Sequence, residues 1–244
     1  RFNSGLGHQL GRWAGDNSKR GDLLDTVNLG CSRGDRPLFR GLALSVRAGE
    51  LLHVTGSNGV GKTTLLRTLA GLSRPDAGAV RWGGAAIAEL GDEYRACMRY
   101  VGHHDGVQGE LSATENLRAI ACLNIADRIE VESALARLGL GALGNLPAKY
   151  FSQGQHRRLA LARLLVLRRP LWILDEPFTA LDATSCRLLE AVLREHLTTN
   201  GIVVLSSHQA FAFPETKTKR LDLDTLRAGD MDDIDRRPLV TAQL

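Results

Sequence analysis

The sequence predicts an α/β fold with a helical insert in its core. Three short apolar runs, at 51–55, 171–174 and 202–205, have the length and the nearly continuous hydrophobicity of buried strands. A glycine-rich segment at 56–61 follows the first run, and a helical pattern begins directly after it at Lys62. A strand, a glycine-rich turn and a helix in this order are typical of α/β proteins.

A block of helical pattern separates the first of these strands from the other two. After Trp82 apolar residues recur at helical spacing through 114–123 and 131–138, and strand-like sequence returns at 171. The sequence therefore predicts a helical insert at about 105–165. Two more strands are predicted, one at 42–46 before the first of these runs and one at 220–223 near the end of the core.

The two ends of the chain differ in composition from the core. Residues 1–22 are rich in Gly, Asn, Ser and charged residues without helical or strand periodicity, so we expect a disordered extension there. We expect the folded domain to span 23–224. Residues 225–244 contain the acidic run 230–235 and are expected to form a charged tail.

The composition is that of an ordinary globular protein. With 244 residues, 43% of them hydrophobic, the chain can form one domain with subdomains or two small domains. A net charge of +4 is explained by arginines on solvated faces as well as by a membrane or nucleic-acid partner. Cys31, Cys97, Cys122 and Cys186 form no C-x-x-C pair, so neither a zinc ribbon nor a redox dithiol is indicated. No apolar run approaches the roughly 18 residues of a membrane-spanning helix, so membrane contact is expected to be peripheral.

The glycine-rich segment fits the phosphate-binding pattern G-x-x-x-x-G-K-[ST]. Its glycines let backbone N–H groups surround phosphates, and the helix that follows presents its positive end. We expect Lys62 to neutralise phosphate charge and Thr63 to ligate Mg²⁺. Alone, the pattern predicts only a nucleotide, as in GTPases, kinases, helicases and transport ATPases. The expected nucleotide-binding residues here are Gly56, Ser57, Asn58, Gly59, Val60, Gly61, Lys62, Thr63 and Thr64.

Two adjacent acids end the second apolar run. Asp175 and Glu176 directly follow 171–174, which places both carboxylates at the C-terminal edge of a buried strand. We expect Asp175 to hold Mg²⁺ and Glu176 to act as the general base that polarises an attacking water. The simpler alternative is a strand that meets a polar turn before Pro177.

A polar cap before an apolar helix makes the assignment specific. The segment Ser152-Gln153-Gly154-Gln155 stands about twenty residues before the two acids. Alone it would be a helix N-cap of no further meaning. In this position it resembles the signature of ABC ATPases, whose cassettes pack head to tail. The resemblance implies a homodimer in which Ser152, Gly154 and Gln155 face ATP held by the other copy.

Two further segments match the same family in the same order. Asp182, in Ala-Leu-Asp, resembles its D-loop residue, and His208, after the strand at 202–205, resembles its switch histidine, which would contact the γ-phosphate. The resemblance covers about 24–223. It implies a P-loop NTPase cassette with a RecA-like core, an antiparallel β subdomain and an α-helical insert, using ATP and Mg²⁺.

Three positions depart from the family pattern. Arg33 stands where an aromatic residue usually stacks on adenine, and its guanidinium is expected to stack instead. His104 replaces the glutamine that normally touches Mg²⁺ and couples to the membrane subunit. Gln153 stands where glycine or alanine is usual. Whether these changes slow the ATP cycle is a hypothesis.

Several segments resemble one subgroup in particular, the cytochrome c maturation ATPases, or haem exporter ATP-binding proteins. They are 56–59, 71–78, 100–103 and 171–182. The resemblance implies a peripheral subunit on the cytoplasmic face of the bacterial inner membrane. It would work with the membrane permease subunits of that system to release a haem-loaded chaperone. Direct haem binding is not expected, because His103 and His104 lack an accompanying C-x-x-C-H.

Three other classes of protein are alternatives to this assignment. An ABC transporter cassette for another cargo is the main alternative. Non-transport ABC proteins that act on nucleic acid would need a coiled coil, a zinc module or a second cassette, and the sequence has none, so no nucleic-acid partner is expected. A P-loop kinase or GTPase would leave Ser152–Gln155 and His208 unexplained.

Overall fold

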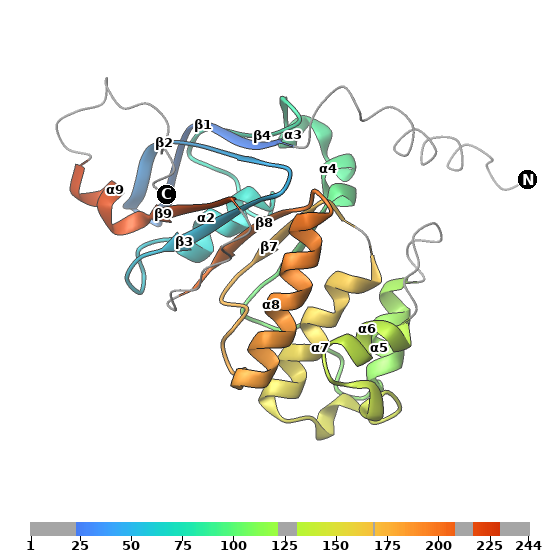
Figure 1. Ribbon diagram of the computed structural model, residues 1–244. Coiled ribbons are helices and arrows are strands. Elements are labelled where there is room, and N and C mark those ends of the chain that lie inside the picture. The colour runs from blue at the N-terminus through green and yellow to red at the C-terminus, as the bar shows by residue number, and fades with distance from the viewer. Residues whose placement is uncertain (1–22, 122–130, 168, 208–216, 230–244) are drawn as a thin grey trace, which may run out of the picture.

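The computed structural model describes residues 23–121, 131–167, 169–207 and 217–229. Within them, an antiparallel sheet lies on one side of a parallel sheet, and helices α7 (Gln153–Val166) and α8 (Ala183–Thr198) lie on the other (Figure 1). The expected extension at 1–22 and most of the expected tail lie outside the described residues.

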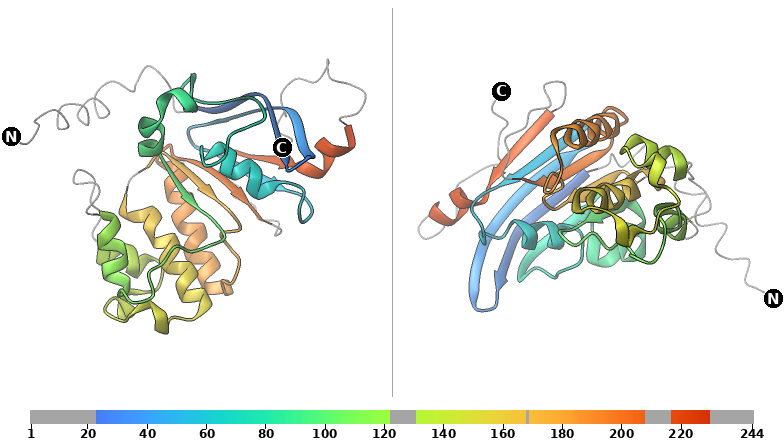
Figure 2. Two further views of the ribbon diagram at one scale, coloured as in Figure 1. Left: turned by 180° about the vertical axis from the view of Figure 1, so that it is seen from behind. Right: turned by 90° about the horizontal axis from the view of Figure 1, so that it is seen from below.

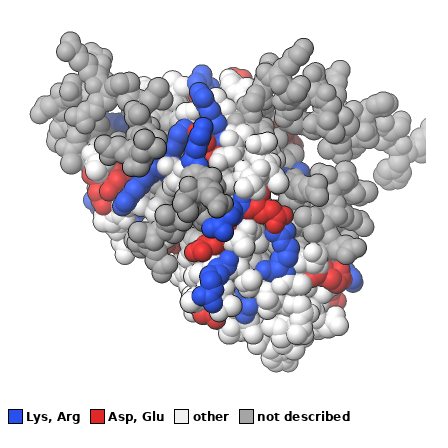
Figure 3. Space-filling view, in the orientation of Figure 1, with Lys and Arg blue, Asp and Glu red and all other residues white. Residues whose placement is uncertain are grey.

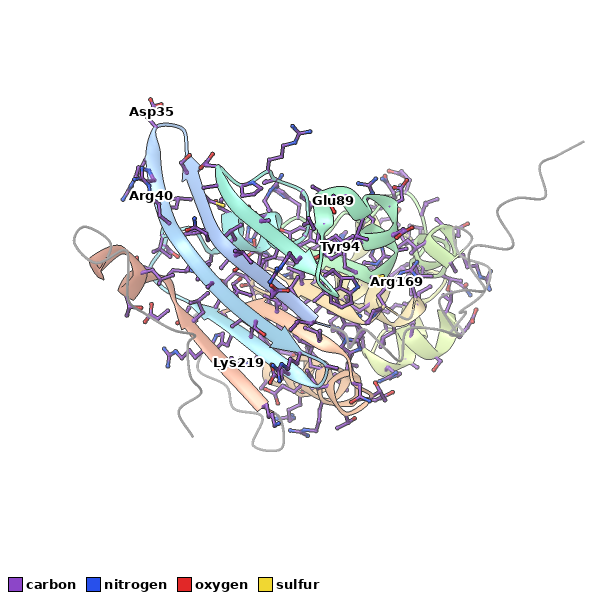
Figure 4. The ribbon with its side chains drawn as sticks, turned by 90° about the horizontal axis from the view of Figure 1, so that it is seen from above. Asp35, Arg40, Glu89, Tyr94, Arg169 and Lys219 are labelled. Carbon is purple, nitrogen blue, oxygen red and sulfur yellow. The ribbon has the colours of Figure 1, made fainter. Side chains whose placement is uncertain are left out.

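The antiparallel sheet has the strand order β2-β1-β4-β5. Its long central pair, β1 (Leu23–Arg33) and β2 (Arg36–Arg47), forms a hairpin in which Arg33 pairs with Arg36. β4 (Ala77–Trp82) pairs with the other side of β1, and the short β5 (Ala85–Ala86) completes the sheet. Asp35 marks the tip of the hairpin in Figure 4.

The parallel sheet has the order β6-β7-β8-β3-β9. All neighbouring pairs are parallel, so the C-terminal ends of the strands meet at one edge. The strands are β6 (Met98–Val101), β7 (Leu171–Leu174), β8 (Ile202–Ser206), β3 (Glu50–Thr55) and β9 (Lys217–Asp222).

The helices divide between the two sides of this sheet. α2 (Lys62–Leu69) follows β3 directly, and α3 (Ile87–Leu90) and α4 (Asp92–Cys97) lie between β5 and β6. In the two views of Figure 2, α5 (Ala113–Ala121) and α6 (Val131–Arg137) lie against α7. This group is the predicted helical insert. Two short 3₁₀ segments, Gly141–Leu143 and Ala148–Tyr150, connect α6 to α7.

Alternating strand residues supply two separate hydrophobic clusters. Leu52, Ile173 and Val204 belong to the cluster that includes α2 and the antiparallel sheet. Leu51 and Val203 belong to the cluster that includes α5, α6, α7 and α8. Because side chains alternate along a strand, the parallel sheet is covered on both faces, as its nearly continuous apolar strands predict. On the face shown in Figure 3, Lys and Arg are interspersed with Asp and Glu, as expected for arginines on solvated surfaces.

Three elements differ from the sequence-based expectation. The strand expected at 42–46 is the second half of the longer β2. β6 lies where a helical pattern was expected, because its four residues pair with β7 along their whole length. The third is α9 (Leu223–Gly229), which follows β9 and extends into the expected tail. Asp222 starts it, since the Asp222 carboxylate accepts a hydrogen bond of 3.0 Å from the N–H of Asp224.

Candidate nucleotide-binding site

The glycine-rich segment joins the C-terminal end of β3 to the first residue of α2. Gly56 and Gly61 adopt φ angles of 136° and 121°, which side chains rarely tolerate. A Cβ atom on Gly56 would lie 2.9 Å from Val60, and one on Gly61 would lie 3.3 Å from Leu38. The two glycines therefore allow the tight loop around the N-terminus of α2.

A cavity of about 390 Å³ opens in front of this loop. It brings together residues from the β1–β2 hairpin, the glycine-rich segment, the loop after β6 and the loop after β7. Arg33 is among them, at the place where the sequence predicts an adenine contact. The lining residues are Arg33, Leu38, Asn58, Gly59, Gly61, Lys62, Thr63, Thr64, His103, Glu176 and Thr179.

The Lys62 ammonium lies inside the curve of the loop. Its Nζ donates hydrogen bonds to the carbonyl oxygens of Gly56 and Ser57, at 2.8 Å and 3.2 Å. Only 8% of the residue is exposed. A positive charge is thus held at the mouth of a helix N-terminus, which is an arrangement suited to a phosphate group.

Asp175 is fully enclosed and hydrogen-bonded on both carboxylate oxygens. Oδ2 accepts from the Thr63 hydroxyl at 2.7 Å, and Oδ1 accepts from the Ser206 hydroxyl at 2.7 Å. Asp175 follows β7, Ser206 ends β8 and Thr63 is the second residue of α2. Burial, assisted by the Asp175 carboxylate, raises the pKa of Tyr100 to about 12, so that phenol stays protonated.

Glu176 lines the cavity from a strained backbone position. Its φ angle is 50°, which is uncommon for a residue with a side chain. Its N–H donates to the Ser206 hydroxyl at 2.9 Å. Ser206 therefore contacts both acids at once and fixes where the chain turns after β7.

Arg157, on α7, connects the loop after β6 to the loop after β7. Its Nη2 donates to the carbonyl oxygens of Asp175 and Glu176, both at 2.8 Å. Its Nη1 donates to the carbonyl oxygen of Gly102 at 2.8 Å and to the Asp105 carboxylate at 2.9 Å. The helix that begins at the signature segment thus positions the two acids and the loop after β6.

The signature segment forms a complete capping box at the start of α7. The Ser152 hydroxyl accepts from the Gln155 N–H at 3.2 Å, and the Gln155 side chain accepts from the Ser152 N–H at 2.8 Å. A Cβ atom on Gly154 would lie 2.9 Å from the Ala180 carbonyl oxygen, so glycine lets the two loops approach. Ser152, Gly154 and Gln155 do not line the cavity of this copy.

Asp182 performs the same local role for α8. Its carboxylate accepts from the Ser185 N–H at 2.7 Å, and hydrogen bonding by Ser185 lowers the pKa of Asp182. Asp182 therefore stays ionised on the exposed side of its loop.

Two histidines, His104 and His208, are predicted at the site. His104 does not line the cavity, whereas its neighbour His103 does. The two rings are 5.9 Å apart between centroids. His208 lies outside the described residues, so its expected place at the γ-phosphate stays a prediction.

Sequence reasoning missed several residues that hold the site together. Ser206 and Arg157 belong to segments that were singled out for other residues, and nothing in their local pattern indicates these contacts. Asp224, on α9, is the most distant of them. Its two carboxylate oxygens accept hydrogen bonds of 2.7 Å each from the N–H and the hydroxyl of Ser57. The predicted loop is thus anchored from a helix that the sequence did not predict.

This arrangement matches a known family. A model of the ABC transporter family matches residues 39–179. A cytochrome c biogenesis ATP-binding export protein, CcmA, from Nitrosomonas europaea is 48% identical over 191 residues, which cover 77% of this chain and 89% of the relative. The chain belongs to the ABC transporter family, in its group of cytochrome c biogenesis ATP-binding export proteins.

Two further comparisons agree with this assignment. The CcmA protein of Escherichia coli is 43% identical over 207 residues, covering 85% of this ABC cassette and 99% of the relative. An ABC transporter ATP-binding protein from Pyrococcus furiosus has a TM-score of 0.72 at 25% identity, covering 83% of this chain and 98% of that one. The ABC cassette is therefore an ATPase with the expected P-loop fold. Within the described ranges, no helix combines the length and hydropathy required to cross a membrane.

Proposed function

We propose that two copies of this cassette bind MgATP between them and hydrolyse it to drive membrane subunits in c-type cytochrome biogenesis. The observation that carries the ATP part is the hydrogen-bonded group of Thr63, Asp175 and Ser206 beside the phosphate loop. It supports the expected roles because one buried carboxylate joins the start of α2, next to the loop, to the segment after β7 that contains Glu176.

The phosphate loop is proposed to bind the β- and γ-phosphates. Lys62 would exchange its contacts with the Gly56 and Ser57 carbonyls for phosphate oxygens, and the N–H groups of the loop would orient the chain of phosphates. Arg33 lines the same cavity on the hairpin side and is proposed to stack on the adenine ring.

Thr63 and Asp175 fit Mg²⁺ by the chemistry of their donors. Their oxygens already share one hydrogen bond, and Mg²⁺ prefers hydroxyl, carboxylate and phosphate oxygens. When bound there, the ion would neutralise charge that develops on the phosphates. His104 is proposed as a further contact, although in this copy His103 is the histidine that lines the cavity.

Glu176 is proposed as the general base. Glu176 lines the cavity next to the phosphate loop. Its backbone N–H donates to the Ser206 hydroxyl and its carbonyl oxygen accepts from Arg157, which holds its position. The side chain would accept a proton from the attacking water. His208 is proposed to hold that water and the γ-phosphate in line.

The remaining family residues are proposed to act across a dimer. Ser152, Gly154 and Gln155 stand at the exposed N-terminus of α7 and would face the γ-phosphate of the other copy. Asp182 would lie at the same interface. ATP would hold the two copies together, and hydrolysis would release them.

The transport part rests on the relatives. They are named for cytochrome c biogenesis and export, and they cover most of this chain. We propose a peripheral place on the cytoplasmic face of the bacterial inner membrane, with the permease subunits of the cytochrome c maturation system as partners. Hydrolysis would release a haem-loaded chaperone. The alternative is a cassette that serves a permease for another cargo.

Three departures from the family pattern give a separate test of the cycle. We expect Arg33→Tyr, His104→Gln and Gln153→Ala, singly and together, to raise ATP turnover if these positions slow it. Phosphate release at saturating MgATP measures this. Unchanged rates in all variants would show that the departures are neutral.

Co-purification from membranes tests the whole proposal. Wild type, Glu176→Gln and the surface control Glu93→Gln would be purified, assayed for ATP turnover, and their associated proteins identified by mass spectrometry. We expect cytochrome c maturation membrane proteins with all three, and loss of hydrolysis only in Glu176→Gln. Recovery of a different permease would leave the ATPase assignment standing and contradict the cytochrome c assignment.

A further inference from the structure

A second cavity, of about 450 Å³, lies at the edge of the parallel sheet opposite to the nucleotide site. Its residues include Arg169 and Pro170, which precede β7, and Gly201, which precedes β8. Since β7 has four residues, this edge is about 13 Å from Asp175. We call this the arginine cavity. Its polar and aromatic lining consists of Arg137, Arg169, Trp172, Glu195 and His196.

Two stacked rings form a rigid wall of the arginine cavity. The centroids of Trp172 and His196 are 3.6 Å apart, and the ring planes differ by 1°. A Cβ atom on Gly201 would lie 2.2 Å from His196 Nε2, so the stack depends on glycine there. Burial lowers the pKa of His196 to about 4, which keeps the ring neutral near pH 7.

Trp172 brings an unused hydrogen-bond donor to this wall. The residue is only 4% exposed. Its indole Nε1 has no hydrogen-bond partner among the described residues. Buried donors are normally satisfied, so an N–H left without an acceptor beside a cavity indicates a missing oxygen.

Several arginine side chains lie close to Trp172. Arg99 is the register partner of Trp172 in the neighbouring strand, so the two side chains share the face that α7 and α8 cover. Burial, together with repulsion by Arg163 and Arg169, lowers the pKa of Arg99 to about 10. The Nε and Nη2 groups of Arg99 are buried and have no hydrogen-bond partner within the described part of the chain.

Carboxylates do not balance these charges among the described residues. Glu195 is engaged by Arg137 at 2.5 Å, and Arg163 donates to the carbonyl oxygens of Asp105 and Gly106. For Arg99 and Arg169 the structure records neither an ion pair nor a hydrogen bond in the described ranges. The missing acceptors are costly for the buried Nε and Nη2 of Arg99, because water has been removed from these atoms and not replaced.

We propose that the arginine cavity binds a small oxyanion, a phosphate or carboxylate group that carries a short apolar body. Arg169 lines the cavity and would hold the oxyanion, because a guanidinium group matches its paired oxygens, and the indole of Trp172 would donate to it. Arg99 is not one of the lining residues and would add positive charge from its place beside Trp172. Leu164, Leu165 and Val192 line the rest of the cavity and would contact the apolar part. Figure 4 shows Arg169 well away from the hairpin tip at Asp35, in agreement with a site separate from the nucleotide cavity.

The Trp172 indole N–H gives a direct readout. The chain has three tryptophans, so a ¹⁵N-labelled full chain shows few indole signals, and Trp172→Phe identifies the relevant one. Inorganic phosphate and hexanoate would be titrated separately at constant ionic strength. We expect a saturable shift of the Trp172 signal with at least one of them, and the stronger probe identifies the oxyanion class.

Four variants separate this site from the phosphate loop and from general charge effects. Arg169→Gln should weaken the response about tenfold or more, and Arg99→Gln should weaken it less, because Arg99 does not line the cavity. Lys62→Ala, in the phosphate loop, and Arg74→Gln, an exposed control, should leave it unchanged. A response that is absent with both probes, that keeps its full strength in Arg169→Gln, or that disappears in Lys62→Ala would overturn the proposal.

The melting temperature provides a second test, in which one substitution should raise the stability of the free protein and weaken its stabilisation by the ligand. In buffer without phosphate or carboxylate, Arg99→Met should raise Tm, because it removes one of two repelling, partly buried cations and keeps most of the packing. The same variant should reduce the increase in Tm that the effective probe gives to the wild type. If Arg99→Met instead lowers Tm in that buffer, Arg99 has an internal partner and the proposed site is wrong.

Discussion

The two edges of the parallel sheet differ in whether their charged side chains have hydrogen-bond partners. At the C-terminal edge, Asp175 is 1% exposed and both of its oxygens accept hydroxyl hydrogen bonds. At the N-terminal edge, Arg99 has two buried N–H groups with no recorded acceptor among the described residues. The first arrangement is complete in the folded chain, whereas the second lacks an anion. The comparison teaches that a buried charge can be matched within the fold, as at Asp175, and that Arg99 and Trp172 carry donors which the described residues do not match.

The largest expected effect lies at the C-terminal edge. Asp175→Asn removes the charge that is proposed to hold Mg²⁺, so we expect ATP turnover to fall about 100-fold or more. Phosphate release measured over a Mg²⁺ titration checks this. The control is Asp92→Asn, whose carboxylate pairs with Arg95 on the exposed surface and should contribute little. A normal rate for Asp175→Asn would break the assignment of roles at this edge.

The N-terminal edge should control the response of stability to acid. His196 has its pKa lowered to about 4 by burial, below that of an unfolded histidine near 6.5. The unfolded chain therefore binds the proton first, and stability is lost as the pH falls from about 6.5 to 4, by up to about 3 kcal/mol.

The check is the difference between wild type and His196→Phe in urea unfolding at several pH values. The variant keeps a ring against Trp172 and should lack this component of the acid dependence. If the two proteins lose stability in parallel between pH 6.5 and 4, the histidine is not held neutral by its burial.

Ser206 tests the C-terminal edge further, because its hydroxyl donates to Asp175 and accepts from the N–H of Glu176. Ser206→Ala leaves Asp175 Oδ1 and the Glu176 N–H without that partner inside the fold, so we expect a loss of about 1–3 kcal/mol in the free energy of unfolding. Turnover should fall as well, since Glu176 loses a fixed point. Unfolding curves and steady-state rates measure both, with Ser73→Ala as a control outside the site. Retention of full stability would mean that the contact is dispensable.

The smallest expected effect concerns the support of the phosphate loop by α9. Asp224→Asn weakens two hydrogen bonds to Ser57 that are exposed, so we expect KM for ATP to rise a few-fold, in line with about 0.5–1.5 kcal/mol, with little change in kcat. A double-mutant cycle with Ser57→Ala tests the pairing. Strictly additive effects of the two substitutions would show that the contact carries no binding energy.

Much of the nucleotide site can be read from the sequence because it follows local rules. A glycine-rich turn before a helix and two acids after an apolar strand each place their own residues. The same rules predict the capping box at Ser152. They could not find Ser206, Arg157 or Asp224, because these act through contacts between segments that are 18 to 167 positions apart in the chain.

The sequence by itself determined the α/β class, the helical insert, the phosphate loop, the acid pair and the family resemblance. Tertiary structure alone decided that His103 lines the cavity in place of His104, that 98–101 is a strand, and that α9 anchors the loop. It also placed Arg99 beside Trp172 and Arg169. The physical reason is that periodicity and turn chemistry act over a few residues, whereas strand pairing and charge proximity depend on how distant segments pack.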